Sequence, residues 1–366
     1  MLGTSVARTP GRPPIVEQID RVISTTVRPP ATEAERWDAD VAALDGNILQ
    51  SWRWGAFKAD QGWDVERVRV ATAAGVGLAQ ILLRRVGPLS LGYLPRGPVL
   101  PDDPETAVAL FAAIDAACAS HRAIALIVEP DRPLACAEDP RRIDFAPGPR
   151  PFQPVRTVKV PLLDDEPLLA QMRRDTRANV RRAGRHGVVI EHAAPGPEAA
   201  ARFFALLHET SLRNAFAVHE PAYYESLLRH FGDDALVAFA TVDGHDAVGL
   251  VALRQGAEAI YLYGGSSSQH RVRGAAQVLQ ADAMRWAREA GCRRYDLWGI
   301  PVDDPPTEAL AKGQVARTNG DCWDGLYQFK TGFGGEIVRY PQTLERRYHP
   351  VLGYVARRLL PRYRTA

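Results

Sequence analysis

Hydrophobic and polar positions along this chain of 366 residues repeat one order of elements twice. Apolar alternation and periodicity predict three strands, a helix and a further strand in each half of the sequence. In the first half these elements fall at residues 65–71, 75–84, 89–94, 103–120 and 123–128. In the second half they fall at residues 235–242, 247–254, 259–263, 274–290 and 294–298. The duplication indicates an α/β protein with two related domains packed side by side.

A proline-rich connector separates the two repeats. Four prolines lie between residues 147 and 154, where they disfavour a helix or a central strand, so we place the domain boundary in this stretch. We expect the first domain to comprise residues 36–157 together with 340–366, and the second domain to comprise residues 158–339. Residues 1–35 contain five prolines, which predicts a flexible leader.

Composition narrows the class of protein. Hydrophobic residues make up 46% of the chain and the formal net charge is +2, so an ordered protein is expected and charge alone names no partner. There is no signal-peptide pattern and no apolar run of roughly 18 residues, which favours a cytoplasmic protein. The four cysteines show no CxxC spacing, and metal and nucleophile motifs are absent from the sequence, so we expect reduced thiols, no metal and no other cofactor.

Arginine dominates the basic residues, because only four of the 45 are lysines. Residues 165–186 are predicted as one helix, in which arginines recur every four residues at Arg173, Arg177, Arg181 and Arg185. Like charges at this spacing weaken a helix, so this four-arginine stripe predicts an external anion. A solvated arginine face without a ligand is the alternative.

The C-terminal residues 348–363 have a basic amphipathic pattern. Such a segment either caps the first domain or touches an anionic membrane surface from the cytosol. We favour packing against the first domain.

Two further stretches carry candidate chemistry. Residues 324–336 place Lys330 among aromatic residues and glycines, which predicts a site where the backbone lies close to a ligand. A compact ammonium in an arginine-rich chain indicates a specific role, with a surface lysine after a strand as the alternative. Residues 271–276 read Arg-x-x-Gly-x-Ala before a predicted helix. GNAT N-acetyltransferases use this pattern to bind the pyrophosphate of coenzyme A at the N-terminus of a helix.

Six motifs occur in order between Gln50 and Tyr348. They are Gln50-Ser51-Trp52-x-Trp54-Gly55-x-Phe57-Lys58, Leu94-Pro95-Arg96-Gly97-Pro98, Thr176-Arg177-x-Asn179-Val180-Arg181-Arg182-Ala183, Tyr261-x-Tyr263-Gly264-Gly265-Ser266, Tyr295-Asp296-Leu297-Trp298-Gly299-Ile300-Pro301 and Phe329-Lys330-x-Gly332-Phe333-Gly334-Gly335. Together these motifs resemble the FemABX family of peptidoglycan bridge-forming aminoacyltransferases. No heptad segment interrupts the second domain, so the chain resembles the compact members that lack a coiled-coil arm.

The resemblance implies two tandem GNAT-like domains and two substrates. The donor would be an aminoacyl-tRNA, which the four-arginine stripe would contact through its phosphates. The acceptor would be a muropeptide precursor, either UDP-MurNAc-pentapeptide or lipid II, which reacts through the side-chain amine of the third stem-peptide residue. We expect a monomer in the cytoplasm, with peripheral contact to the inner membrane surface as a further option.

The resemblance also assigns substrate-binding roles. Lys58 and Arg213 resemble the contacts to the acceptor's diphosphate, and both cations suit phosphate oxygens. Glu129 falls where the family often has an acid after the last strand of the first domain. The chain departs from the family near Arg213, because Phe216 and Ala217 stand where we associate a further tyrosine.

Catalytic roles fall on three residues by the same resemblance. Phe329 and Lys330 resemble the pair in the channel where the aminoacyl ester meets the amine, and Tyr263 resembles a tyrosine of the family's site. Two other functions stay open at this point. One is an acyl-CoA-dependent N-acyltransferase, supported by residues 271–276, and the other is a non-catalytic RNA-binding module of GNAT-like fold.

Overall fold

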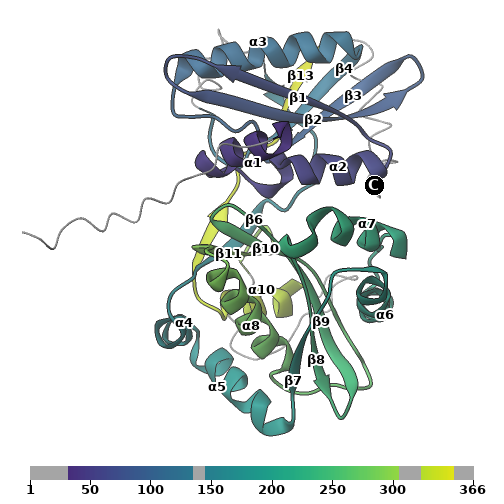
Figure 1. The fold of residues 1–366 in the computed structure, drawn as a ribbon, viewed down its shortest axis with the longest axis vertical. Helices are drawn as coiled ribbons and strands as arrows, with labels where there is room; N and C mark the ends of the chain where they lie inside the picture. Colours follow the sequence, from purple (N-terminus) through teal and green to yellow (C-terminus); the bar gives the residue numbers. More distant parts are fainter. Residues whose placement is uncertain (1–31, 135–144, 305–322, 350–366) are drawn as a thin grey trace, which may run out of the picture.

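The protein consists of two α/β domains stacked along the long axis of the molecule (Figure 1). The computed structural model describes residues 32–134, 145–304 and 323–349. The predicted leader up to residue 31 and the C-terminal segment from residue 350 lie outside the described residues, as do Cys136 and Cys322. In the described part of the chain, no helix is both long enough and apolar enough to cross a membrane.

The first domain contains a six-stranded sheet. Its strands, in spatial order, are β1 (Asp64–Ala71), β2 (Val76–Val86), β3 (Leu89–Pro95), β4 (Ala123–Glu129), β13 (Leu344–Arg347) and β5 (Ala146–Pro147). Only the β3–β4 pair among these is parallel, and α3 (Pro104–Ser120) connects its two strands and covers one face of the sheet. The helices on the side of the second domain are α1 (Glu33–Ala43), η1 (Ile48–Gln50) and α2 (Trp52–Asp60).

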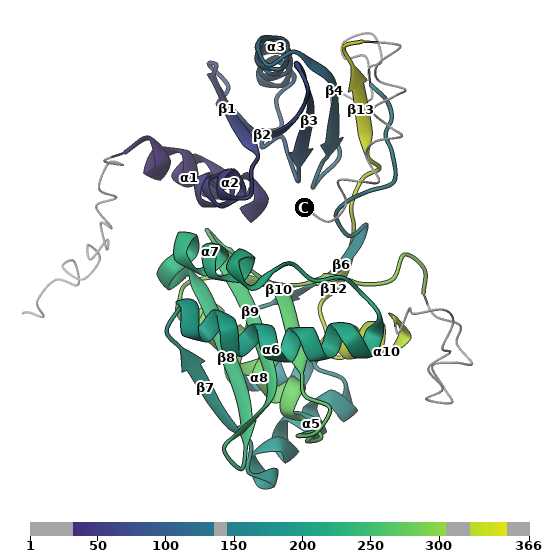
Figure 2. The ribbon, with the colours of Figure 1, turned by 90° about the vertical axis from the view of Figure 1, so that its right-hand side faces the viewer.

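The second domain contains a seven-stranded sheet. Its strands, in spatial order, are β12 (Glu336–Arg339), β6 (Arg156–Pro161), β11 (Arg294–Gly299), β10 (Glu258–Ser266), β9 (His245–Gln255), β8 (Ala235–Val242) and β7 (Val189–Ala193). Its helices are α4 (Asp165–Gln171), α5 (Arg174–Ala183), η3 (Gly184–His186), α6 (Pro197–Asn214), α7 (Pro221–Phe231), η4 (Gly232–Asp234), α8 (Ala275–Glu289) and α10 (Trp323–Thr331). Helices α6 and α7 lie on one face of this sheet and α8 on the other (Figure 2).

The two domains share one core topology, as the sequence predicts. In the second domain β8, β9 and β10 are antiparallel neighbours, α8 follows, and β11 pairs parallel to β10. This matches β1 to β3, α3 and β4 of the first domain. The predicted duplication of an α/β unit is therefore confirmed. The chain enters the second sheet at β6 and returns to the first sheet at β13. The exact domain boundaries predicted from the sequence remain our proposal.

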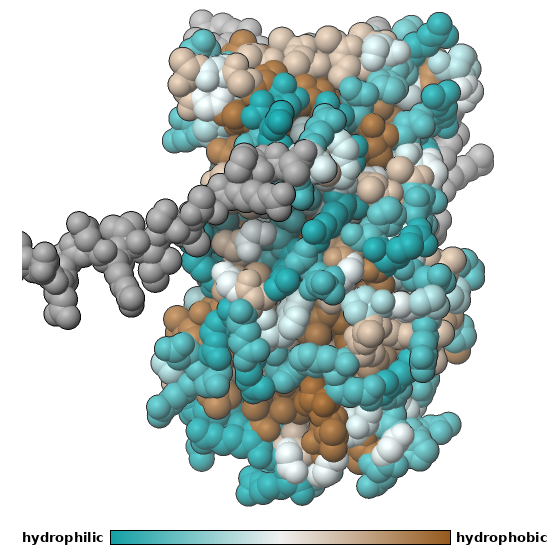
Figure 3. All heavy atoms as spheres, in the orientation of Figure 1, coloured by the Kyte–Doolittle hydropathy of each residue, from teal (hydrophilic) through white to brown (hydrophobic). Residues whose placement is uncertain are grey.

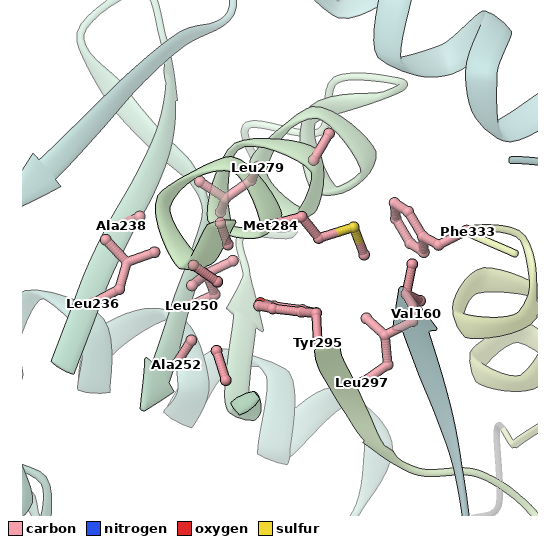
Figure 4. Close-up of a cluster of buried hydrophobic side chains, with 14 of the residues drawn as sticks. Val160, Leu236, Ala238, Leu250, Ala252, Leu279, Met284, Tyr295, Leu297 and Phe333 are labelled. Carbon is pink, nitrogen blue, oxygen red and sulfur yellow. The ribbon is translucent and has the colours of Figure 1, made fainter. Parts of the chain in front are cut away.

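Between α8 and the second sheet lies the largest apolar core among the described residues (Figure 4). Leu279 and Met284 of α8 pack there with Leu250 and Tyr295, all with at most 1% of their surface exposed. Burying each such side chain contributes roughly 1.5–3 kcal/mol. Phe333, which follows α10, closes the same core (Figure 4).

The predicted helix over residues 165–186 is wrong in one respect, because it consists of three pieces. The backbone is extended at Met172 and Arg173, between α4 and α5. The Arg173 N–H donates there to the carbonyl of Gly332 at 2.9 Å, so a residue distant in sequence replaces the intrahelical acceptor. The four-arginine stripe is therefore divided among the N-cap of α5, its body and η3.

The domains meet through both apolar and polar contacts. Phe57 of α2 packs edge-to-face on Tyr223 of α7, with ring centres 4.8 Å apart, and Ile48, Leu49 and Trp54 join the same apolar cluster. Polar contacts include hydrogen bonds from Arg294 to Asp45 at 2.5 Å and from Gln255 to the Asp38 carbonyl at 3.1 Å. On the face shown in Figure 3, hydrophilic residues dominate this junction.

Candidate active site

A cavity of about 350 Å³ lies between the two domains. The first domain contributes side chains from α2, β2 and β3, and the second contributes them from the loop before α7, from α7, β10 and β11. Seven of the lining residues are tryptophan, tyrosine or phenylalanine: Trp54, Trp63, Tyr93, Phe152, Tyr223, Tyr263 and Trp298. The described residues that line it include the cations Lys58 and Arg84 but no Asp or Glu. The cavity therefore suits an anion that carries ring or apolar groups.

Lys58 lies in the last turn of α2, whose start is capped by Ser51. Its side chain is 5% exposed and has no hydrogen bond or ion pair to any described residue. The ammonium lies 5.6 Å from the ring centres of Phe57 and Tyr223 and 5.8 Å from that of Trp63. Burial, helped by the charge of Arg84, lowers the Lys58 pKa to about 8. A buried ammonium without a counterion is costly, so this position favours an anionic ligand.

Arg84 is a second cation of the cavity, and the motifs do not include it. Its guanidinium stacks on Trp63 at 4.5 Å and donates to the Gly62 carbonyl at 3.0 Å, while its Nε is buried without a partner in the described part of the chain. The next residue of β2, Arg85, is 76% exposed and pairs with Asp64. Strand alternation places one of these two arginines inward, but only the domain packing shows which one meets the cavity.

Two indole N–H groups of the cavity wall are also without acceptors. Trp54 Nε1 and Trp63 Nε1 are buried and make no hydrogen bond to the described residues. Together with Arg84 Nε they give three buried donors without a partner on residues around one cavity, and the Lys58 ammonium adds a cation without a counterion among the described residues. Unmatched buried donors cost about 1–3 kcal/mol each, so a ligand rich in acceptor oxygens fits this wall.

Glu129 lies at the end of β4 behind the cavity. Its carboxylate accepts from the Phe152 N–H at 2.5 Å, the Gln153 N–H at 3.0 Å and the Tyr93 hydroxyl at 2.9 Å. Burial raises its pKa, against the lowering effect of these hydrogen bonds. Since Phe152, Gln153 and Tyr93 all line the cavity, Glu129 positions three parts of its wall.

Tyr263 and His219 meet at Tyr223. The Tyr263 and Tyr223 hydroxyls are 3.2 Å apart, and the His219 ring stacks on Tyr223 with centres 3.8 Å apart. Burial raises the Tyr263 pKa well above its ordinary value. Burial and the nearby Lys58 charge lower the His219 pKa. Both tyrosines are therefore neutral hydroxyl donors near pH 7, and His219 is a residue that the motif analysis missed.

Lys330 lies in the last turn of α10, not on the glycine-rich turn that follows. It is 5% exposed, and its ammonium donates to the Gly299 carbonyl at 2.8 Å and lies 5.4 Å from the Tyr261 ring centre. Burial lowers its pKa to about 7, although Asp296 acts in the opposite direction. It does not line the cavity, but it holds the carbonyl next to Trp298, which does.

The glycines after Lys330 are explained by the protein's own backbone. A side chain at Gly334 would come within 2.6 Å of the Gln171 carbonyl oxygen, and one at Gly335 would collide with that of Lys159. Both glycines also have φ above +80°. Close approach of the protein's own backbone therefore accounts for these glycines without a ligand. Phe329 packs edge-to-face on Phe333 at 5.2 Å, against the core of the second domain.

Arg213 lies at the exposed end of α6 and does not line the cavity. Its guanidinium donates to Ser268 Oγ at 2.7 Å, and to Ser266 Oγ at 2.8 Å and the Ser266 carbonyl at 3.1 Å. The serines fix its orientation without neutralising its charge.

The four arginines of the stripe differ in their environment. Arg173 donates to the Gln328 carbonyl, and Arg177 to the Ala170 carbonyl at 3.1 Å, so both also support the fold. Arg181 and Arg185 are exposed. Arg181 and Arg185 can therefore meet an external anion without giving up internal hydrogen bonds such as those that Arg173 and Arg177 make.

The predicted coenzyme A loop at the start of α8 is covered by α5. Gly274 caps α8 with φ of 94°, and a side chain there would collide with the Asn179 carbonyl oxygen. Arg273 donates to the Asn179 side chain at 3.2 Å. In the described ranges there is also no group of three or more His, Cys, Asp or Glu side chains that could hold a metal ion.

Comparisons with known proteins define the class. A family model described as an acetyltransferase (GNAT) domain matches residues 170–305. A crystal structure of FemX has a TM-score of 0.78 at 20% identity, covering 89% of this chain and 98% of FemX. A tandem GNAT protein from the clavulanic acid biosynthesis pathway has a TM-score of 0.50 at 11% identity, covering 87% of this chain and 97% of that one. The chain is thus a protein of two tandem GNAT-like domains.

A curated relative adds information at the level of sequence. The lipid II:glycine glycyltransferase of Staphylococcus aureus is 27% identical over 208 residues, which is 52% of this chain and 48% of the relative. The chain therefore spans about half the length of the curated relatives it matches. Together with the FemX fold, this match confirms the resemblance to the FemABX family that the six motifs indicate.

Proposed function

We propose that this protein is an aminoacyltransferase that transfers an amino acid from an aminoacyl-tRNA to the stem-peptide amine of a peptidoglycan precursor. The precursor is UDP-MurNAc-pentapeptide or lipid II, and the product is the start of an interpeptide bridge. The observation that carries the proposal is the interdomain cavity, which is lined by the Lys58 ammonium and by three residues with a buried donor that has no partner among the described residues, Arg84, Trp54 and Trp63.

The cavity supports a diphosphate-bearing acceptor. Its unmatched donors suit phosphate oxygens, while its aromatic rings suit the rings or apolar groups attached to them. The S. aureus relative is named for a lipid II substrate, which carries this chemistry. Lys58 and Arg84 would bind the diphosphate from inside the cavity. Arg213, held at the end of α6, would meet the acceptor outside it.

The chemical step needs little covalent help from the protein. The acceptor amine forms a bond to the ester carbonyl carbon, the bond to the ribose oxygen breaks, and the nitrogen loses one proton while the ribose oxygen gains one. We assign Tyr263, Phe329 and Lys330 to this part of the site. With a pKa of about 7, Lys330 exists in both protonation states near neutral pH, which suits proton transfer or stabilisation of developing charge. To reach the reacting atoms, the Lys330 ammonium has to give up its hydrogen bond to the Gly299 carbonyl and form one to the substrates instead.

The donor would bind the surface of α5 and η3. Arg181 and Arg185 offer exposed charges there, with Arg173 and Arg177 beside them. An acyl-CoA donor is less well supported, because α5 covers Gly274 at the start of α8, the position of the pyrophosphate in the predicted coenzyme A loop.

The test is to incubate the protein with a pool of charged tRNA and either UDP-MurNAc-pentapeptide or lipid II, and to weigh the products by mass spectrometry. A mass increase of one or more amino acid residues on the acceptor supports the proposal. An acceptor of unchanged mass, together with a melting temperature raised by coenzyme A, would instead favour an acyl-CoA-dependent enzyme. Binding of tRNA with neither result would indicate an RNA-binding module.

A further inference from the structure

An apolar surface lies where α6 ends and the chain turns toward the cavity. Leu212 is 71% exposed and Phe216 is 44% exposed, which makes them two of the few large hydrophobic side chains exposed among the described residues. Ala215 and Ala217 beside them are also exposed. Helices α6 and α7, which flank this loop, lie on the face of the second domain turned to the viewer in Figure 2. We call residues 212–218 the apolar loop.

The apolar loop is fixed at both ends. The Phe216 N–H donates to the Ser211 carbonyl at 3.3 Å, and Ala215 has a left-handed backbone with φ of 54°. At the other end, the His219 N–H donates to the Tyr224 hydroxyl at 3.3 Å. The backbone of the apolar loop is therefore held at both ends while Leu212 and Phe216 stay exposed.

Positive charge accompanies the apolar loop. Arg213 and Arg271 are both exposed and lie close enough for the Arg271 charge to act on Arg213. Of the two nearest acids in sequence, Glu209 accepts a hydrogen bond from the Ser268 N–H and its charge also acts on Arg213, and Glu220 is exposed at the start of α7. Arginines beside a small apolar surface are typical of proteins that lie on anionic lipid surfaces.

Two exposed side chains make too small a surface for a stable protein partner, which usually covers about 800 Å² on each side. Phosphates of an RNA would account for the arginines but not for the exposed leucine and phenylalanine. Interfacial anchoring accounts for both features, because apolar side chains enter the acyl boundary while cations meet the headgroups.

We propose that the apolar loop docks on an anionic phospholipid bilayer and so brings the cavity to the membrane surface. His219, which directly follows the loop, lines the cavity. The loop therefore links the bilayer surface to the site where the diphosphate headgroup of a lipid-linked acceptor would bind. This choice of acceptor rests on the proposed function, whereas the docking itself does not depend on catalysis.

The test uses the full chain and vesicle sedimentation. Wild-type protein should bind vesicles of equal parts phosphatidylglycerol and phosphatidylcholine, and bind pure phosphatidylcholine less tightly. The double variant Leu212→Ser/Phe216→Ser should bind the mixed vesicles at least about tenfold more weakly. Val189→Ser is the matched control, because Val189 is 62% exposed on β7, and its binding should equal that of wild type.

Tryptophan fluorescence provides a second test of docking. Phe216→Trp should keep vesicle binding, and its fluorescence should shift to shorter wavelength when mixed vesicles are added. The double variant must have the wild-type melting temperature for its loss of binding to count. The proposal is overturned if wild type does not sediment with the vesicles, if the double variant binds as wild type, or if the double variant loses tRNA binding and not vesicle binding.

Discussion

The Lys58 ammonium lies 5.6 Å from the centre of the Tyr223 ring, and this contact joins the two domains. Lys58 belongs to α2 of the first domain and Tyr223 to α7 of the second. Neither domain alone forms this cation site, because the buried ammonium and part of its aromatic surroundings come from helices of different domains. If the cavity binds the acceptor as proposed, a change in the angle between the domains alters this binding directly.

Replacing Lys58 with Met keeps the length of the side chain and removes its charge. We expect the apparent KM for the diphosphate-bearing acceptor to rise at least about tenfold, because a charge-assisted hydrogen bond is worth roughly 1.5–3 kcal/mol. The affinity for tRNA should not change. Arg213→Ala should act in the same direction. Unchanged acceptor kinetics in both variants would show that the acceptor binds elsewhere.

The neighbours Arg84 and Arg85 provide an internally controlled comparison. Arg84→Gln should raise the acceptor KM by about tenfold or more, since it removes a cation from the cavity wall. Arg85→Gln should leave the kinetics within twofold, because this side chain faces solvent and exposed ion pairs contribute roughly 0–1 kcal/mol. Steady-state kinetics with varied acceptor distinguish the two variants. Equal effects of the two substitutions would contradict the assignment.

The salt dependence of tRNA binding tests the arginine surface. Each phosphate contact should contribute a slope of about −0.7 to −0.9 in a plot of log affinity against log salt. Arg181→Gln/Arg185→Gln should flatten the slope by roughly 1.5 in total, without loss of an internal hydrogen bond. Arg36→Gln, on the exposed side of α1, is the control and should not change it. If the double variant has the wild-type slope, the surface is a solvated arginine face.

Lys330→Met tests both stability and catalysis. Because folding lowers the Lys330 pKa from 10.5 to about 7, the unfolded chain binds the extra proton between these values. The wild-type free energy of unfolding should therefore rise as the pH increases from 7 toward 10. In the Lys330→Met variant this rise should be smaller, by on the order of a few kcal/mol. Urea unfolding at several pH values measures this difference.

The catalytic part of the same prediction is a kcat reduced by at least about 100-fold, with both substrates bound within a few fold of wild type. Lys330→Arg should restore little, since a planar guanidinium cannot take the place of a compact ammonium. A folded Lys330→Met protein with a normal single-turnover rate would leave Lys330 with a structural role at the Gly299 carbonyl.

The duplicated topology could be predicted because its strands are long and buried. β4 is buried along its whole length, and β8 along most of it, so their apolar runs are unambiguous. The edge strands β7 and β12 were missed, since most of their residues are exposed or half-buried and carry little apolar pattern. β6 was missed for another reason: its neighbours β11 and β12 come from much later in the chain.

The site could be predicted only in part. The motifs identify Lys58 and Tyr263, which the fold brings to one cavity. They miss Arg84 and His219, whose position depends on how the domains pack. The glycines near Lys330 were interpreted as making room for a ligand, whereas they make room for the backbone of α4 and β6. Sequence alone does not distinguish these two causes of close approach.

The placement of β13 has a consequence for biosynthesis. This strand pairs with β4 through Leu344 and Val128, yet almost the whole second domain separates the two strands in sequence. Until residues 344–347 have left the ribosome, the buried strand β4 has one open edge. The seven strands of the second sheet all lie between residues 156 and 339, so they can pair with one another before β13 has been synthesised. The N-terminal domain is therefore the later one to be completed, and its open apolar edge is the part of the nascent chain most exposed to wrong pairing.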